Sequence, residues 1–263
     1  MIEALSDSFA LIGRHMRHLT RVPEKLLAVT LLPIAFVFIF GTLFGSSMSV
    51  PDGDYQQYIM AGIFAQLMLS SLDTTSVGIA FDLKNGLVDR FRSLPISQAA
   101  VLVGRTVSDL SLIGLSCAVM AVVGYVIGWR VEGGPLSVLG GFLLLLLLGL
   151  AMSWVGALIG LVVRNPEAVN SVATFITMPL TFLSAAFFPI GNLPDWLRII
   201  AEWNPVSAVV TAVRQLWHNP TGIGADPALP LQNPVPFAII LSVVALLLFA
   251  PLAGRAYRRA SAR

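Results

Sequence analysis

Three ionisable residues lie inside apolar stretches that are long enough to cross a bilayer: Asp73, Arg105 and Asp109. A carboxylate near the middle of a membrane-spanning helix costs on the order of 2.5 to 3.5 kcal/mol to insert, so something must compensate for its charge. Arg105 and Asp109 are four residues apart, which puts both on one face of a helix and predicts a structural ion pair. Charge compensation within the membrane is therefore the first chemistry that the sequence offers.

Asp73 belongs to a polar stripe. Gln66, Ser70 and Asp73 follow one another at spacings of four and three residues, and Gly62 extends the same face. Such a stripe must face a helix bundle, a partner helix or a wet pathway. Two interpretations stay open, which are the lining of a pathway or dimer interface and purely structural hydrogen bonding. Asp73 also joins the Arg105 pair if their two helices are neighbours.

A second, weakly polar face follows in the apolar stretch at residues 168–189, where hydroxyl and amide side chains again recur at helical spacing. This face is interpreted either as contact with a substrate or as ordinary membrane packing. Its candidate residues are Asn170, Thr174, Thr177 and Thr181, with Met178 and Phe182 close by.

Composition identifies the elements that carry these residues. Of 263 residues, 56% are hydrophobic and 11% are charged, whereas soluble domains have roughly 25% charged residues. The sequence therefore predicts an all-α integral membrane protein with a single transmembrane domain over residues 1–263. Six apolar stretches are near or above the ~20 residues that a spanning helix needs. They cover residues 26–46, 57–80, 104–128, 136–163, 168–189 and 235–254.

Basic residues predict the orientation. Most arginines and both lysines fall on one side of the predicted spans, which makes that side cytoplasmic and puts both termini there. Residues 1–22 alternate apolar and basic positions and are expected to form an amphipathic helix in the cytoplasmic interface. Residues 190–234 are expected outside, as one or two interfacial or re-entrant helices anchored by Trp196, Trp203 and Trp217.

Residues 82–97 form a charged segment between the second and third predicted spans. Leu83, Leu87, Phe91 and Leu94 share one helical face there, which suits docking into a groove on another protein. An ordinary solvated loop is the other interpretation.

The charged segment and the residues that follow it also resemble a known family. Asp82 to Gly86, Asp89-Arg90-Phe91-Arg92, Leu94-Pro95 and Gly104-Arg105 resemble the cytoplasmic loop of type-2 ABC exporter permeases, especially daunorubicin-exporter-like membrane subunits. A second block resembles the last extracellular segment of that family, and it contains Leu183-Ser184, Pro189, Leu193-Pro194, Trp196-Leu197-Arg198, Asn204-Pro205 and Arg214. Asp82 and Leu87 depart from the commoner Glu and Thr of the family.

The resemblance implies the permease subunit of an ATP-driven exporter that moves a hydrophobic or amphiphilic substrate, such as a drug, an antibiotic or a lipid, out of a bacterial cell. It implies a dimer with a second permease and two ABC ATPase subunits, which would bind ATP and Mg²⁺. The outer block would cap the pathway, and the second and fifth helices would surround it. The implied pathway residues are Gln66, Ser70, Asp73, Thr174, Thr177, Met178, Thr181 and Phe182. The implied ATPase-coupling residues are Asp82, Gly86, Leu87, Asp89, Arg90, Phe91, Arg92, Leu94 and Pro95.

Other functions find little support in the sequence. A phosphate-binding loop ends in Gly-Lys-Ser or Gly-Lys-Thr, but Lys25 and Lys84 follow Glu24 and Leu83, so ATP must bind elsewhere. We expect no catalytic residue and no metal or other cofactor in the chain. The expected partners are membrane lipid and protein, and not nucleic acid. Motifs of an intramembrane enzyme are absent from the sequence. The alternative function is an ion-coupled secondary carrier that uses Asp73, Arg105 and Asp109 as a relay.

Overall fold

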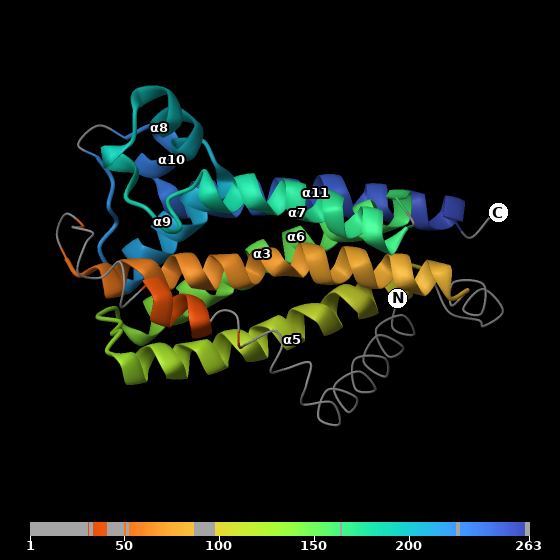
Figure 1. Cartoon of the computed structure of the whole chain (residues 1–263), viewed down its shortest axis with the longest axis horizontal. Helices are drawn as coiled ribbons and strands as arrows, with labels where there is room; N and C mark the ends of the chain where they lie inside the picture. The colour runs from red at the N-terminus through yellow and green to blue at the C-terminus, as the bar shows by residue number, and fades with distance from the viewer. Residues whose placement is uncertain are drawn as a thin grey trace.

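The computed structural model describes residues 31, 34–40, 50, 53–86, 98–163, 165–224 and 227–260, which are arranged as an elongated bundle of helices (Figure 1). Four of its helices are long and apolar enough to cross a membrane. These are α3 (Tyr55–Lys84), α5 (Gln98–Ile127), α6 (Pro135–Val163) and α11 (Pro234–Ala260). The chain is therefore a multi-pass membrane protein. The first predicted span, residues 26–46, lies mostly outside the described residues, as does the predicted interfacial helix at residues 1–22.

Helix α3 is the centre of the bundle. It packs against α5, α6, α9 and the shorter α7 (Pro166–Phe182), and most of its residues are buried. The small-residue face of α6 explains the closest of these contacts. A Cβ atom added at Gly156 or Gly160 would clash with the carbonyl oxygen of Leu72 or Ser76 on α3. The Ser71 hydroxyl further donates a hydrogen bond of 2.7 Å to the Gly149 carbonyl.

Helix α7 is shorter than the predicted span at residues 168–189, because it ends at Phe182. Pro179 lies in its last turn, where a proline removes one backbone donor from the helix. The segment after α7 does not return to α-helix before Pro189. Its carbonyl groups accept hydrogen bonds from other elements instead, notably from Tyr55 and Tyr58 of α3. The prediction of a continuous fifth helix to residue 189 is therefore wrong.

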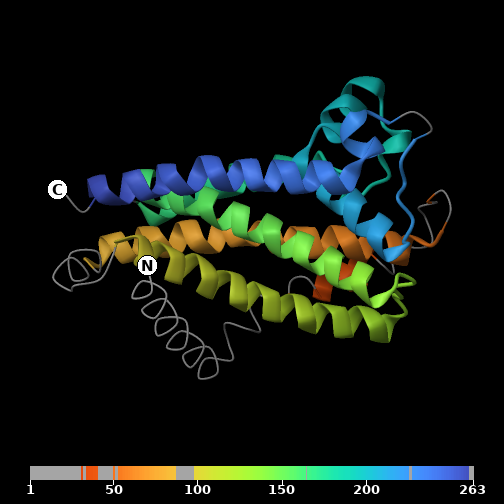
Figure 2. The ribbon, with the colours of Figure 1, turned by 180° about the vertical axis from the view of Figure 1, so that it is seen from behind.

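One end of the bundle carries a group of short helices (Figures 1 and 2). They are the 3₁₀ helix η2 (Ile190–Asn192), α8 (Asp195–Glu202), α9 (Pro205–Trp217) and α10 (Leu229–Gln232). Helix α8 exposes Trp196, Ile199 and Ile200, and its C-cap residue Trp203 is exposed as well. Two of the three predicted tryptophan anchors, Trp196 and Trp203, are thus exposed. Helix α9 is instead buried against α3, α6 and α11.

Trp217 corrects one expectation for this region. It was predicted to anchor the outer segment at the membrane surface, but its side chain is 0% exposed. Its ring lies 5.0 to 5.5 Å from the rings of Phe64, Trp129 and Phe142, centroid to centroid. Trp217 is therefore a core residue that joins α9 to α3 and α6.

The connection between α3 and α5 begins at the opposite end of the bundle. Helix α3 continues to Lys84, so the first residues of the predicted cytoplasmic helix at 82–97 belong to α3. The chain then turns at Gly86, whose φ of 66° favours glycine. Helix α5 begins at Gln98, earlier than the predicted residue 104. The coupling candidates Leu87, Asp89, Arg90, Phe91, Arg92, Leu94 and Pro95 lie outside the described residues.

Candidate functional site

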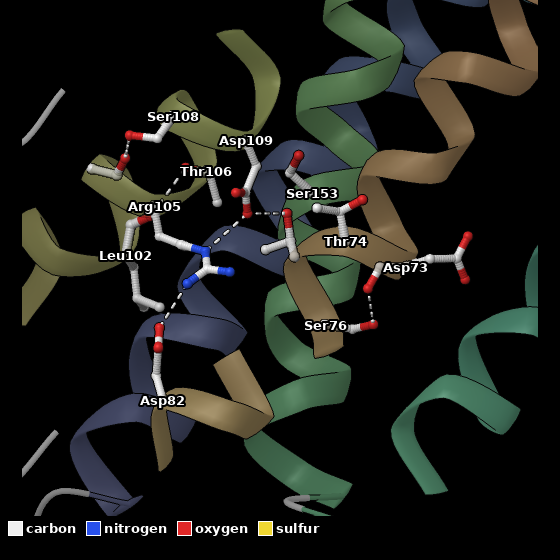
Figure 3. Close-up of polar contacts among 12 residues, drawn as sticks. Asp73, Thr74, Ser76, Asp82, Leu102, Arg105, Thr106, Ser108, Asp109 and Ser153 are labelled. Atoms are coloured by element: carbon white, nitrogen blue, oxygen red, sulfur yellow. Dashed lines mark hydrogen bonds and ion pairs between the residues drawn. The ribbon is translucent and has the colours of Figure 1, made fainter. Parts of the chain in front are cut away.

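Arg105 is the centre of a charged network between α3 and α5 (Figure 3). Its Nε donates to Asp109 Oδ2 at 3.0 Å, and its Nη1 donates to Asp82 Oδ2 at 2.8 Å. The Thr75 hydroxyl donates a third hydrogen bond, of 3.0 Å, to Asp109 Oδ2. The positive charge of one guanidinium thus offsets the negative charges of two carboxylates. Carboxylates that are partly removed from water need such a partner. The predicted partner Asp109 is joined by Asp82 from the end of α3.

Asp73 lies on the other side of α3. Its carboxylate points away from Arg105 and Asp109 (Figure 3), so the expectation that it joins their ion pair is wrong although α3 and α5 are neighbours. The physical reason is helical phase. Thr75 and Asp82 are seven residues apart and share the face toward α5, whereas Asp73 falls roughly 200° around the helix from Thr75.

The two predicted polar faces meet at one point. The Thr181 hydroxyl on α7 donates a hydrogen bond of 2.6 Å to Gln66 Oε1 on α3. Gln66, Ser70 and Asp73 are each half-buried, although their neighbours along α3 are almost all buried. The stripe on α3 is thus the side of this helix that the described elements leave partly uncovered.

The predicted face of α7 divides into two. Thr177 and Thr181 are buried, at 7% and 2% exposure, and Thr177 donates to the Ala173 carbonyl of its own helix. Thr174, Met178 and Phe182 are exposed. The spacing still puts Thr174, Thr177 and Thr181 on one side of α7, so the predicted face is covered in one part and open in another. Its covered part contacts α3 through Thr181.

Arg214 builds a second polar centre, at the end that carries α8, α9 and α10. Its side chain is 0% exposed, and it donates to the carbonyl groups of Tyr58 (3.0 Å), Ala185 (2.8 Å) and Ala186 (3.0 Å). Its guanidinium carbon also lies 3.4 Å from the centroid of the Tyr58 ring. Burial lowers the pKa of Arg214, but an arginine stays protonated in proteins.

The sequence analysis includes Arg214 in the outer block that carries the family resemblance, but it does not predict the buried role of this side chain. Arg214 fixes the irregular chain after α7 against α3. Tyr58 helps by donating to Ala185 at 2.9 Å, and Asn204 donates to Leu183 at 2.7 Å. Tyr55 and Tyr58 at the start of α3 were the available signal, since buried tyrosines need hydrogen-bond acceptors.

No cluster of three or more His, Cys, Asp or Glu residues that could hold a metal ion occurs among the residues that the structure describes. The candidate site in the described part of the chain is of another kind. It consists of a partly open polar stripe with one carboxylate, beside the exposed side chains of α7.

The model of the ABC-2 type transporter family matches residues 7–217 of this chain. The chain is similar to a daunorubicin resistance ABC transporter permease, DrrB1 of Streptomyces coeruleorubidus, with 30% identity over 98% of this chain and 88% of that protein. The chain therefore belongs to the ABC-2 type transporter family and is a permease subunit, whose ATPase activity lies in a separate subunit.

More distant relatives agree. The doxorubicin resistance ABC transporter permease DrrB of Mycobacterium tuberculosis (strain CDC 1551 / Oshkosh) is 25% identical over 88% of this chain and 82% of its own length. A putative transport permease, ycf38 of Cyanophora paradoxa, is 23% identical over 81% of this chain and 74% of its own length. These similarities confirm the resemblance found in the sequence.

Proposed function

We propose that this permease exports a hydrophobic or amphiphilic compound, drug-like or lipid-like, through a route between α3 and α7. The names of two relatives refer to daunorubicin and doxorubicin resistance, which supports a drug-like cargo. The observation that carries the proposal is the hydrogen bond between Gln66, on the half-buried polar stripe of α3, and Thr181 of α7. Met178 and Phe182 of α7 are exposed. A surface of mixed polarity suits an amphiphile.

The active assembly in this proposal contains two permeases, identical or homologous, and two ABC ATPase subunits that bind ATP and Mg²⁺. Each permease has six spans, with α7 and the stretch at residues 26–46 added to the four long helices. Residues 82–97 dock on the ATPase and transmit its closure to α3 and α5. Asp82 supports this link, because its bond to Arg105 ties the start of that segment to α5.

Both termini lie in the cytoplasm in this proposal, and residues 190–234 lie outside the cell. The arrangement of the helices supports it. The end of α3 and the C-terminal end of α11 lie at one end of the bundle, and α8, α9 and α10 lie at the other (Figure 1). Arg255, Arg258 and Arg259 therefore share an end with Asp82 and Lys84, in keeping with the excess of basic residues on the cytoplasmic side.

A relay through Asp73, Arg105 and Asp109, as the carrier alternative requires, has no support in the geometry. Arg105 bonds to Asp82 and Asp109, while Asp73 points to the opposite side of α3 (Figure 3). Family membership also favours the ATP-driven mechanism.

Replacing Leu87, Phe91 and Leu94 together with Asp tests the coupling role. Each buried apolar side chain contributes about 1.5 to 3 kcal/mol, so we expect the triple variant to lose association with the ATPase by far more than tenfold. Co-purification from detergent-solubilised membranes measures this. Leu229→Asp, an exposed position at the other end of the bundle, is the control and should keep the ATPase. Unchanged association and export in the triple variant would contradict the proposed coupling role.

A further inference from the structure

One oxygen of the Asp73 carboxylate lacks a hydrogen-bonding partner where one is needed. Its Oδ1 atom is buried and accepts no hydrogen bond from any residue that the structure describes. Nearby hydroxyls do not serve it: Ser70 donates to the Leu67 carbonyl at 2.6 Å, and Thr74 donates to the Ser70 carbonyl at 2.9 Å. A carboxylate in a membrane-spanning helix without a partner is costly, and such residues commonly mark a functional site.

Arg105, the cation on the neighbouring helix α5, is not available to Asp73. It lies on the far side of α3 and is bonded to two other carboxylates, those of Asp82 and Asp109 (Figure 3). Any positive charge that pairs with Asp73 must therefore come from outside this network.

The surroundings of Asp73 follow from the packing of α3 and α7, which run in opposite directions (Figure 1). The hydrogen bond between Gln66 and Thr181 fixes their register. Seven residues along each helix, about 10 Å at 1.5 Å per residue, bring Asp73 to the level of Thr174. Thr174 is exposed, and Met178, one turn further along α7, is 58% exposed. The half-buried Asp73 therefore lies at the same level along the bundle as an exposed hydroxyl and an exposed apolar side chain of α7.

We infer that Asp73 recognises a cationic group, such as an ammonium, on the amphiphilic cargo. This inference rests on the proposed export function and specifies the class of cargo. An ammonium at the accessible part of the half-buried Asp73 side chain supplies the positive charge that the carboxylate lacks. A charge-assisted hydrogen bond in a medium of low polarity is stronger than one in water. An uncharged analogue leaves the carboxylate unpaired, so the site favours cations over neutral molecules of the same shape.

The test uses the full permease–ATPase complex in inside-out vesicles and two fluorescent probes. One is a dansyl-labelled alkylamine with a free ammonium, and the other is its N-acetylated, uncharged form. Removing the charge with Asp73→Asn should lower ATP-dependent uptake of the amine by about tenfold, the loss expected for one charge-assisted hydrogen bond, and leave uptake of the acetylated probe unchanged. Asp73→Glu keeps the charge and should retain the preference for the amine.

Asp54→Asn is the matched control, because it makes the same chemical change at an exposed position just before α3, where the side chain makes no capping bond. It should leave uptake of both probes unchanged. Equal losses of both probes in Asp73→Asn, or loss of permease assembly on size-exclusion chromatography, would show that Asp73 serves packing or pairing with the second permease and would overturn the inference. Unchanged uptake of both probes would overturn it as well.

The same experiment distinguishes failure of the proposed export function from failure of the inference about Asp73. The export function fails if the unaltered complex takes up neither probe in response to ATP, whereas the inference alone fails if the unaltered complex transports both probes and Asp73→Asn does not distinguish them.

Discussion

Arg214 shows how a fully buried arginine is accommodated without a carboxylate. Its donors are satisfied by the main-chain carbonyls of Tyr58, Ala185 and Ala186, and its planar face lies on the Tyr58 ring. These carbonyls lie where α3 meets the irregular chain after α7, so one side chain supplies the hydrogen bonds that a continuous helix would have supplied. A lysine has one ammonium and cannot reproduce this planar arrangement.

Replacing Arg214 with Met should lower the free energy of unfolding by on the order of 3 kcal/mol, because it leaves buried carbonyls without donors. That corresponds to a fall of roughly 6 to 12 °C in the melting temperature of the solubilised protein. Arg198→Met on α8 is the control, since its contacts with Asp195 and Glu202 are 3.6 and 3.7 Å long. Equal shifts in the two variants would contradict the role given to Arg214.

The sequence predicted the local parts of the polar sites and not the remote ones. Arg105 and Asp109 are one helical turn apart, so their spacing alone predicted their contact. Asp82 and Thr75 reach the same network from another helix, which requires the rotation of α3 relative to α5. Spacing cannot supply that rotation, so the sequence could not decide whether Asp73 joins the network once α3 and α5 are neighbours.

At the scale of elements, the contact between α3 and α6 depends on glycine. Gly156 and Gly160 allow the backbones to approach so closely that a methyl group would meet carbonyl oxygens of α3. Close approach through small residues is a common means of helix association in membranes. The structure identifies α3 as the partner of this small-residue face of α6.

Gly156→Ala should destabilise the protein by about 1 to 3 kcal/mol, because the Leu72 backbone cannot move aside as a flexible side chain would. The expected fall in melting temperature is about 2 to 12 °C. Gly254→Ala on α11, where an added Cβ meets nothing within 4 Å, is the matched control and should be neutral or slightly stabilising. A harmless Gly156→Ala would mean that the two helices pack less closely than described.

The ends of elements were predicted less well than their existence. The apolar pattern continues to Pro189, but α7 ends at Phe182 because donors from Tyr55, Tyr58 and Arg214 serve the carbonyls that follow. These donors are more than twenty residues away in sequence, so no local pattern reveals them. The same holds for Trp217, whose burial depends on three aromatic rings from α3, α6 and the loop between α5 and α6.

At the scale of the whole molecule, the two ends of the bundle differ in kind. One end carries short helices with the exposed apolar residues Trp196 and Trp203, and the other carries the arginines of α11. Figure 2 shows the same separation from behind. The lengths of the apolar stretches and the distribution of arginine predicted that these two groups of residues lie at opposite ends. Both are properties of the sequence that need no knowledge of packing.

Cysteine labelling tests the orientation of the two ends. Cys117 is the only cysteine of the chain, so Cys117→Ala removes every native thiol and gives an unreactive background. A membrane-impermeant maleimide should label Trp196→Cys in intact cells and should label Arg259→Cys only after permeabilisation, because the first position is proposed to lie outside and the second in the cytoplasm. The reverse pattern would contradict the proposed orientation.

The central claim is that ATP bound by a partner subunit drives export of an amphiphile by this chain. The most direct measurement is reconstitution of the chain with its ABC ATPase partner, followed by ATP hydrolysis and amphiphile uptake in inside-out vesicles. We expect a stable complex whose hydrolysis rises with the amphiphile and whose uptake stops without ATP. Failure to associate with the ATPase, or uptake that continues without ATP under an ion gradient, would contradict the claim.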